Sequence, residues 1–317
     1  MSAGSTFVDR GQCHMPGLWA IFTVIAAGGQ VLRNAQQKEL TQALGTVGAT
    51  HVRFLFGFPF GLLFLIGVLV VTGSGLPRPA LVFWPWVVDG ALAQILATAL
   101  MLSAMNDRSF VVTIAYIKTE PVQVALFGFV LLGDVVTLPM AIAILIATAG
   151  VIVMSLRPGA TGRVGHIGGH GSIKPTLLGL AAGAMFGWSA IGYRGAILSL
   201  ENTGYVLAAT YTLVTGLLMQ ALLLSAYLWL RDRDALIAIV RAWRPSLLAG
   251  FMGALASQFW FLAFALATAA SVRTLALVEV LFAQAISRFV FKQAMTGREA
   301  LGIVLIVIGV ALLLWAH

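Results

Sequence analysis

The sequence predicts an all-α integral membrane protein of ten transmembrane helices, arranged as two inverted five-helix repeats. Apolar residues make up 60% of the 317 positions and charged residues only 9%, whereas soluble domains carry about a quarter charged residues. Ten apolar stretches are long enough to span a bilayer, and the pattern of the first half recurs in the second. So few charges cannot cover a water-exposed surface, so we expect lipid to surround most of the exterior.

Ten apolar stretches are the predicted membrane spans. A helix needs about 20 predominantly apolar residues to cross the hydrocarbon core of a bilayer. The predicted spans are residues 17–34, 50–72, 81–105, 109–132, 137–156, 175–199, 203–230, 245–267, 270–291 and 298–316. The longest connection is rich in Gly and His and lies at the midpoint of the chain. We therefore expect a first repeat at residues 1–156, a linker at 157–174 and a second repeat at 175–317.

The two halves of the chain share a pattern. A shift of 159 residues places every predicted span of the first half on a span of the second, with Trp84 on Trp243 and Glu120 on Glu279. Because five is an odd number of crossings, two such halves lie in opposite orientations in the membrane. Inverted repeats are typical of secondary transporters, which bind solutes near the bilayer midplane between the repeats.

The basic residues are dispersed along the chain. The formal net charge is +8, but Lys and Arg occur a few at a time between apolar stretches. Nucleic-acid binding needs a clustered basic surface, so we expect no nucleic-acid partner. Charges in short connections instead set the orientation of membrane helices.

Motifs at five places in the chain carry a family resemblance. Residues 120–134 (EPVQVALFGFVLLGD) combine a proline early in the motif with a Leu-Gly-acid end. Small residues and glycines follow at 147–151, 187–194 and 302–309, and Arg53 lies at the opening of the second predicted span. These motifs, spread over nearly the whole chain, resemble those of the EamA-type ten-helix transporters of the drug/metabolite transporter (DMT) superfamily.

The resemblance implies a secondary transporter, an exporter of a small organic metabolite that works by alternating access. It implies a multi-pass protein of a bacterial inner (plasma) membrane, surrounded by membrane lipid, acting as a monomer or homodimer without a cofactor. Protons are a candidate coupling ion. Two departures from the family pattern, Val280 in place of a proline and Gln293 in place of an acidic residue, imply that the halves are not functionally equivalent.

An intramembrane enzyme acting on a lipid or isoprenoid is the alternative interpretation. Such an enzyme needs acids or histidines clustered at one membrane face, and the sequence shows no Asp-x-x-Asp pair and no P-loop. His166 and His170 have a helical spacing, but the glycines of the segment GHIGGHG favour a flexible linker over a metal site. We therefore expect no metal and no enzymatic activity.

Three ionisable residues lie deep within predicted spans. Lys118 and Glu120 fall in the fourth span and Glu279 in the ninth, where a charge usually faces a cavity or a partner. Positions two apart point to different faces of a helix, so we expect Lys118 to approach Glu279, and Glu120 to approach Arg273 or Arg53. Either these charges line a solute path, with Lys118 the residue whose neutralisation most impairs transport, or they are buried ion pairs that fix helix packing.

The predicted solute site combines charged, amide and aromatic residues from several spans. The cations exceed the acids, which favours a carboxylate-bearing or amino-acid-like solute. Arg33, His51 and Arg194 lie nearer the predicted span ends, where we expect them to extend toward headgroups. The candidate solute-binding residues are Lys118, Glu120, Glu279, Arg273, Arg53, Tyr116, Gln94, Gln258 and Trp260.

Glycines at helical spacing predict close helix contacts. Gly179, Gly183 and Gly187 share one face of the sixth span, and Gly57 and Gly61 share one face of the second. Small residues at this spacing let helices approach closely in a membrane. We interpret both faces as packing surfaces.

The Lys and Arg distribution predicts that both termini lie outside the cytoplasm, because cytoplasmic connections carry the excess of basic residues. A GFP fused to the C-terminus is therefore expected to stay dark in a bacterium, and bright cytoplasmic fluorescence would contradict this orientation. The opposite side carries little more than Arg10 and Arg78. The basic residues assigned to the cytoplasmic side are Arg33, Lys38, Arg108, Arg157, Arg163, Lys174, Arg231, Arg233, Arg241, Arg244, Lys292 and Arg298.

Overall fold

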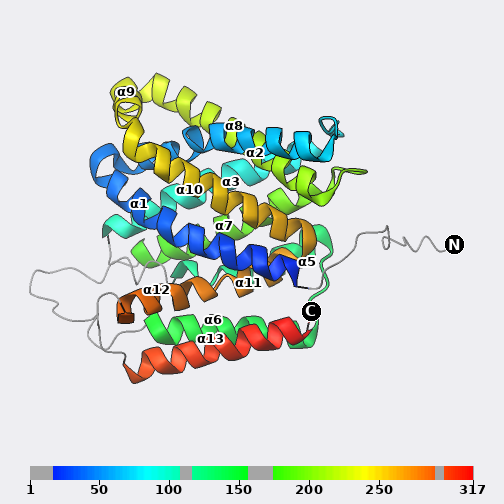
Figure 1. The fold of residues 1–317 in the computed structure, drawn as a ribbon. Helices are drawn as coiled ribbons and strands as arrows, with labels where there is room; N and C mark the ends of the chain where they lie inside the picture. The colour runs from blue at the N-terminus through cyan, green and yellow to red at the C-terminus, as the bar shows by residue number, and fades with distance from the viewer. Residues whose placement is uncertain (1–16, 108–115, 156–173, 290–295, 317) are drawn as a thin grey trace, which may run out of the picture.

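A computed structural model describes residues 17–107, 116–155, 174–289 and 296–316. Within these ranges every regular element is a helix, which confirms the all-α prediction (Figure 1). The helices are α1 (Leu18–Leu55), α2 (Gly57–Thr72), α3 (Phe83–Asp107), α5 (Glu120–Leu132), α6 (Leu138–Ser155), α7 (Lys174–Leu198), α8 (Tyr205–Arg231), α9 (Arg233–Arg241), α10 (Trp243–Leu266), α11 (Ala269–Leu275), α12 (Val278–Phe289) and α13 (Gly297–Ala316).

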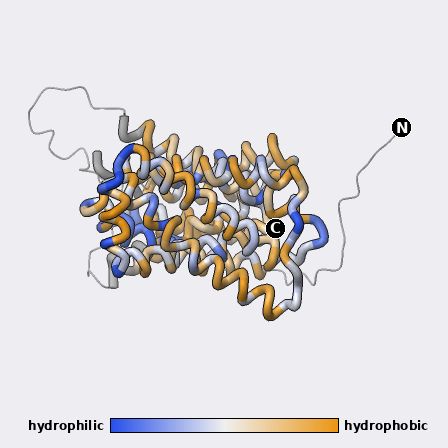
Figure 2. The backbone as a smooth tube through the Cα atoms, turned by 90° about the horizontal axis from the view of Figure 1, so that it is seen from above, coloured by the Kyte–Doolittle hydropathy of each residue, from blue (hydrophilic) through white to orange (hydrophobic). Residues whose placement is uncertain are grey.

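The exterior of the helical bundle is apolar. Five helical stretches of the described residues are long and apolar enough to cross a membrane, and hydrophobic residues run along the outer helices (Figure 2). Large side chains such as Val71 on α2, Val130 on α5 and Leu230 on α8 are 86%, 67% and 80% exposed. Lysine, arginine and glutamate side chains are buried inside the same bundle. A multi-pass integral membrane protein has this arrangement, because lipid is the solvent for the outer face.

The main helix contacts join early elements to late ones. α1 packs along α10, α3 along α7, α6 along α13 and α2 along α8. α1 begins and α13 ends at the same end of the bundle (Figure 1). Glycines allow a close approach between α6 and α13: a Cβ added at Gly302 would lie 2.6 Å from the carbonyl oxygen of Gly150.

Residues 35–49, predicted to connect the first two spans, are helical instead. α1 continues through them to Leu55, and the axis bends at Gly45, whose φ of 69° lies in the left-handed region. The segment Ala35–Leu44 reads AQQKELTQAL. It is too polar for a hydropathy-based span, but it consists almost entirely of good helix formers. Helix propensity therefore continues where the apolar pattern stops.

Two predicted spans are broken near their middle. Residues 118 and 119 form a turn before α5, and residues 276 and 277 form a turn between α11 and α12. Pro121 accounts for the first break, because proline has no amide hydrogen to give the preceding turn. No proline marks the second break, so the residue pattern does not predict it.

Two connections between predicted spans remain to be compared with the structure: the one after the seventh span and the linker between the halves. α9 lies in what was predicted to be the loop after the seventh span, and its first turn is capped by Asp232, which accepts a hydrogen bond from the amide of Ala235 at 3.0 Å. The predicted linker at 157–174 lies outside the described residues, except for Lys174 at the start of α7.

Gly302→Ala is expected to destabilise the protein, because the added methyl group meets the backbone of α6, which cannot move away as a side chain can. Overpacking of this kind costs about 1–3 kcal/mol, measured as a lower melting temperature of the purified protein. The control is Gly67→Ala in α2, where no atom lies within 4 Å of the added Cβ. Equal melting temperatures for the two variants would contradict close α6–α13 packing.

Candidate functional site

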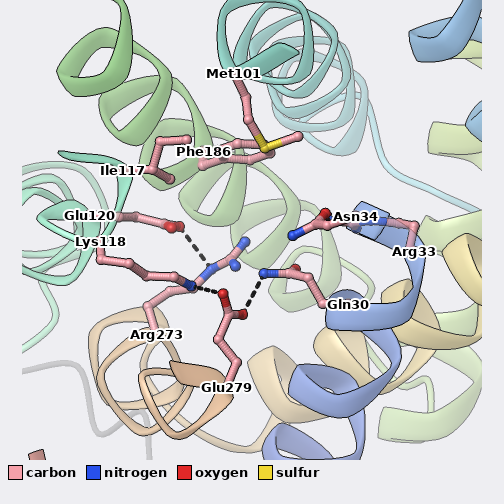
Figure 3. A pocket seen from close by; sticks show the side chains of 10 residues that line it. All are labelled: Gln30, Arg33, Asn34, Met101, Ile117, Lys118, Glu120, Phe186, Arg273 and Glu279. Atoms are coloured by element: carbon pink, nitrogen blue, oxygen red, sulfur yellow. Dashed lines mark hydrogen bonds and ion pairs between the residues drawn. The ribbon is translucent and has the colours of Figure 1, made fainter. Parts of the chain in front are cut away.

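A pocket lies where several helices of both halves meet (Figure 3). α1, α3, α7, α11, α12 and the chain around the break before α5 each contribute to it. Its lining residues are Gln30, Arg33, Asn34, Met101, Ile117, Lys118, Glu120, Phe186, Arg273 and Glu279.

The two helix breaks position the charged residues of this pocket. Lys118 lies in the turn before α5, and Glu120 is the first residue of α5. Glu279 lies in the first turn of α12, directly after the second break. A carboxylate at the start of a helix is stabilised by the positive end of the helix dipole. The breaks therefore place both glutamates where a buried negative charge is least unfavourable.

Two ion pairs cross the pocket. Lys118 pairs with Glu279, and Arg273 Nε lies 3.0 Å from Glu120 Oε1, as Figure 3 shows. Neither of these last two atoms has a hydrogen-bond partner, so that contact is an ion pair without hydrogen-bond alignment. The predicted pairing of Lys118 with Glu279 is confirmed, and of the two partners predicted for Glu120 the structure has Arg273 and not Arg53. Each pair joins a residue of the first half of the chain to one of the second. Lys118 therefore has the structural partner that its packing interpretation requires.

A polar and aromatic network holds the second carboxylate and the arginine in place. Gln30 Nε2 donates to Glu279 Oε2 at 2.9 Å, and Gln30 Oε1 accepts from the indole nitrogen of Trp260 at 3.1 Å. The Arg273 guanidinium lies 4.7 Å from the centre of the Trp260 ring and 5.4 Å from that of Phe264. Trp260, a predicted site residue, therefore supports Arg273 from outside the pocket lining.

Arg33 lies inside the pocket wall and not at a membrane surface. Its side chain is buried, with Nε and Nη2 donating to Asn34 Oδ1 at 3.3 and 2.8 Å. The prediction that it reaches headgroups is wrong, because α1 continues well past it and places it in mid-helix.

The same prediction is wrong for His51. His51 is buried and shares a 3.0 Å hydrogen bond with Ser225. Arg194 Nη2 lies 3.3 Å from Asp134 Oδ1, in the turn after α5. Burial raises the pKa of the Asp134 carboxyl, and Arg194 opposes that rise.

Besides Trp260, four predicted site residues do not line the pocket. Arg53 Nη1 lies 3.3 Å from the Thr98 hydroxyl, and Gln94 Oε1 accepts from Gln220 at 2.9 Å. Gln258 donates to the Thr210 hydroxyl at 2.8 Å, and Tyr116 packs against Gly179. In this structure these side chains link helices to one another.

Sequence reasoning missed one wall of the pocket and all of the α1 contribution. Met101, Ile117 and Phe186 lie together on the side opposite Gln30 and Glu279 (Figure 3). Apolar residues in a membrane span carry no signal that separates a pocket wall from packing. The adjacent Arg33 and Asn34 did offer a signal, since two polar residues end an apolar stretch there.

The glycine face of α7 packs against the broken helix, as predicted. A Cβ at Gly183 would lie 3.0 Å from the carbonyl oxygen of Ile117, and one at Gly187 would lie 2.8 Å from Val124 Cγ2. Close contact with α7 thus fixes the backbone on either side of Lys118 and Glu120. The prediction for Gly57 and Gly61 also holds, because both contact Leu217 of α8.

The second half of the chain matches a known protein family. The sequence profile of the EamA-like transporter family matches residues 175–315. Those residues form an EamA-like transporter family domain. The domain includes α7 to α13 and supplies Arg273 and Glu279 to the pocket, while the preceding part of the chain supplies Lys118 and Glu120.

The whole chain resembles solved structures in fold. One crystal structure aligns over 94% of this chain and 95% of its own, with a TM-score of 0.67 and 16% sequence identity. At this identity the likeness concerns the fold alone. The comparison with curated proteins gave no match. The second half of the chain is therefore similar to the transporters of the EamA-like family.

Lys118→Ala is expected to lower the melting temperature, because it removes the cation from Glu279 and leaves a buried carboxylate whose one donor among the described residues is Gln30. Breaking a buried pair in this way costs about 3–5 kcal/mol. Adding Glu279→Gln removes the stranded charge, so the double variant is expected to recover most of the lost stability. A Lys118→Ala variant as stable as the unmodified protein would show that the pair does not fix the packing.

Proposed function

We propose that the protein is a secondary transporter that exports a small organic metabolite with a carboxylate group, by alternating access between two inverted five-helix repeats. The observation that carries this proposal is the pocket crossed by two ion pairs, each formed between the two halves of the chain. The EamA-like domain supports transport. The pocket supplies a place for the solute between elements that can move relative to one another.

The helix contacts support the repeat organisation, with repeats at 1–156 and 175–317 and ten spans. A 159-residue shift places the start of α1 on α7 and places α3 on α10. The α1–α10 and α3–α7 contacts are then equivalent, with the roles of the halves exchanged. The two helix breaks also correspond, and so do Glu120 and Glu279. Reciprocal contacts of this kind are expected of inverted repeats related by a pseudo-twofold axis.

The ion pairs suggest how solute and conformation are coupled. A pair between halves holds them together, so rocking of the halves must lengthen it or exchange its partners. A carboxylate on the solute competes with Glu120 or Glu279 for Lys118 and Arg273. The solute's binding to those cations then offsets the loss of the ion pairs that hold the halves in one conformation. The solute therefore binds one conformation more tightly than the other, and this difference in affinity is what shifts the population between them.

Protons are the proposed coupling ion. When a solute carboxylate takes Lys118 or Arg273, the released glutamate is left in an apolar surrounding. A buried carboxylate without a cation favours the protonated form. One proton taken up from one side and released on the other would link solute flux to a pH gradient.

Solute flux is the direct test. The purified protein in liposomes is expected to exchange labelled carboxylates and amino acids with a pool on the other side, at rates well above those of protein-free liposomes. Arg273→Gln should abolish the exchange. The matched control, Arg78→Gln, removes one exposed arginine and should not affect it. Rates equal to those of protein-free liposomes for the whole panel would contradict the proposal, and rates unchanged by a pH gradient would exclude proton coupling alone.

A further inference from the structure

The pocket lining holds one more basic residue than acidic residues. Arg33, Lys118 and Arg273 line it, against Glu120 and Glu279. Lys118 and Arg273 each have one of the two carboxylates. Arg33 forms no ion pair with any carboxylate of the described residues, and its guanidinium donates hydrogen bonds to the neutral Asn34 side chain. An uncompensated charge in a membrane interior is costly, and sites that contain one commonly bind a partner of opposite charge.

A second arginine strengthens the positive potential at this place. Arg33 and Arg53 both lie against Gly253 of α10, where a Cβ would be 3.7 Å from Arg33 Cδ and 3.2 Å from Arg53 Cγ. Arg53 is also buried, and it contacts the Thr98 and Ser257 hydroxyls without a carboxylate among the described residues. Two arginines side by side repel one another, and an anion next to them relieves that repulsion.

Resting on the proposed function, we propose that Arg33 is the seat of the solute's anionic group and that the solute carries a net charge of about −1 with an apolar body. Arg33 presents a planar set of donors suited to a carboxylate. The amides of Gln30 and Asn34 line the pocket beside it. Met101, Ile117 and Phe186 face the apolar body from the other side of the pocket (Figure 3).

The same contacts disfavour an amino acid. Both pocket glutamates already have a cation, and Glu279 also accepts from Gln30. A solute ammonium group would find no free carboxylate and would add to the cationic surplus. A carboxylate without an amine compensates Arg33 and adds no further positive charge beside the two ion pairs.

Four small molecules with a common skeleton and different charges test this proposal. They are 3-phenylpropanoate (anion), phenylalanine (zwitterion), 3-phenylpropanamide (neutral) and 2-phenylethylamine (cation). A ligand that binds the folded state raises the melting temperature. We expect 3-phenylpropanoate to raise that of the purified protein most, and the amide and the amine to leave it unchanged. A larger rise with phenylalanine, or equal rises with all four, would overturn the proposal.

Variants locate the anion. Arg33→Gln is expected to weaken 3-phenylpropanoate binding by about tenfold or more, as loss of a charged hydrogen bond does. Arg33→Lys keeps the charge but not the planar donors, so it should retain part of the binding, and Arg78→Gln should retain all of it. Undiminished binding by Arg33→Gln would overturn the assignment. If that variant does not fold, Arg33→Lys and the four-compound series decide.

The liposome assay separates this proposal from the proposed function. Exchange by the unmodified protein together with undiminished 3-phenylpropanoate binding by Arg33→Gln would refute the role of Arg33 and leave transport standing. Binding that depends on Arg33, without exchange of any solute, would refute transport and leave the anion site standing.

Discussion

The compensation of buried charge between the two halves is the constraint on which this structure depends. Two glutamates and three cations lie in a pocket surrounded by apolar helices, where an isolated charge is strongly unfavourable. Each glutamate receives its cation from the opposite half of the chain. Neither half can therefore bury its own acid alone, and the charges specify how α5 and the loop before it meet α11 and α12.

The backbone near the pocket satisfies this constraint by interrupting two helices. An unbroken helix would point residues 118 and 120 to different faces and leave the glutamates in mid-helix, away from a helix start. The turns before α5 and α12 place both carboxylates at helix starts. Broken helices are tolerated in a membrane where they line a cavity or are covered by protein. Here the glycine face of α7 covers the first break at close range.

The two halves differ in where the buried cation lies relative to the buried glutamate. The cation lies two positions before the glutamate in the first half (Lys118 and Glu120) and six positions before it in the second (Arg273 and Glu279). Arg273 is also held by two aromatic rings, whereas Lys118 has a flexible stem and, among the described residues, one ion pair. The pocket is consequently asymmetric, with apolar residues on one side and Arg33 beside amides at another. An asymmetric solute with a charged head and an apolar body suits such a pocket better than a symmetric one.

The sequence by itself determined the membrane environment, the all-helical class and the pairing of Lys118 with Glu279, and for Glu120 it left two candidate partners, Arg273 and Arg53. These follow from composition, from span length and from the cost of a lone charge in lipid, and none of the three depends on knowing the tertiary structure. Only the tertiary structure decided the role of Arg33, since its position within α1 depends on a polar helix segment that hydropathy interprets as a loop. Only the structure located the break at 276–277, because no proline marks it, and the wall formed by Met101, Ile117 and Phe186. Apolar side chains look alike in a sequence whether they face lipid, another helix or a solute, and that choice is made by which helices pack together.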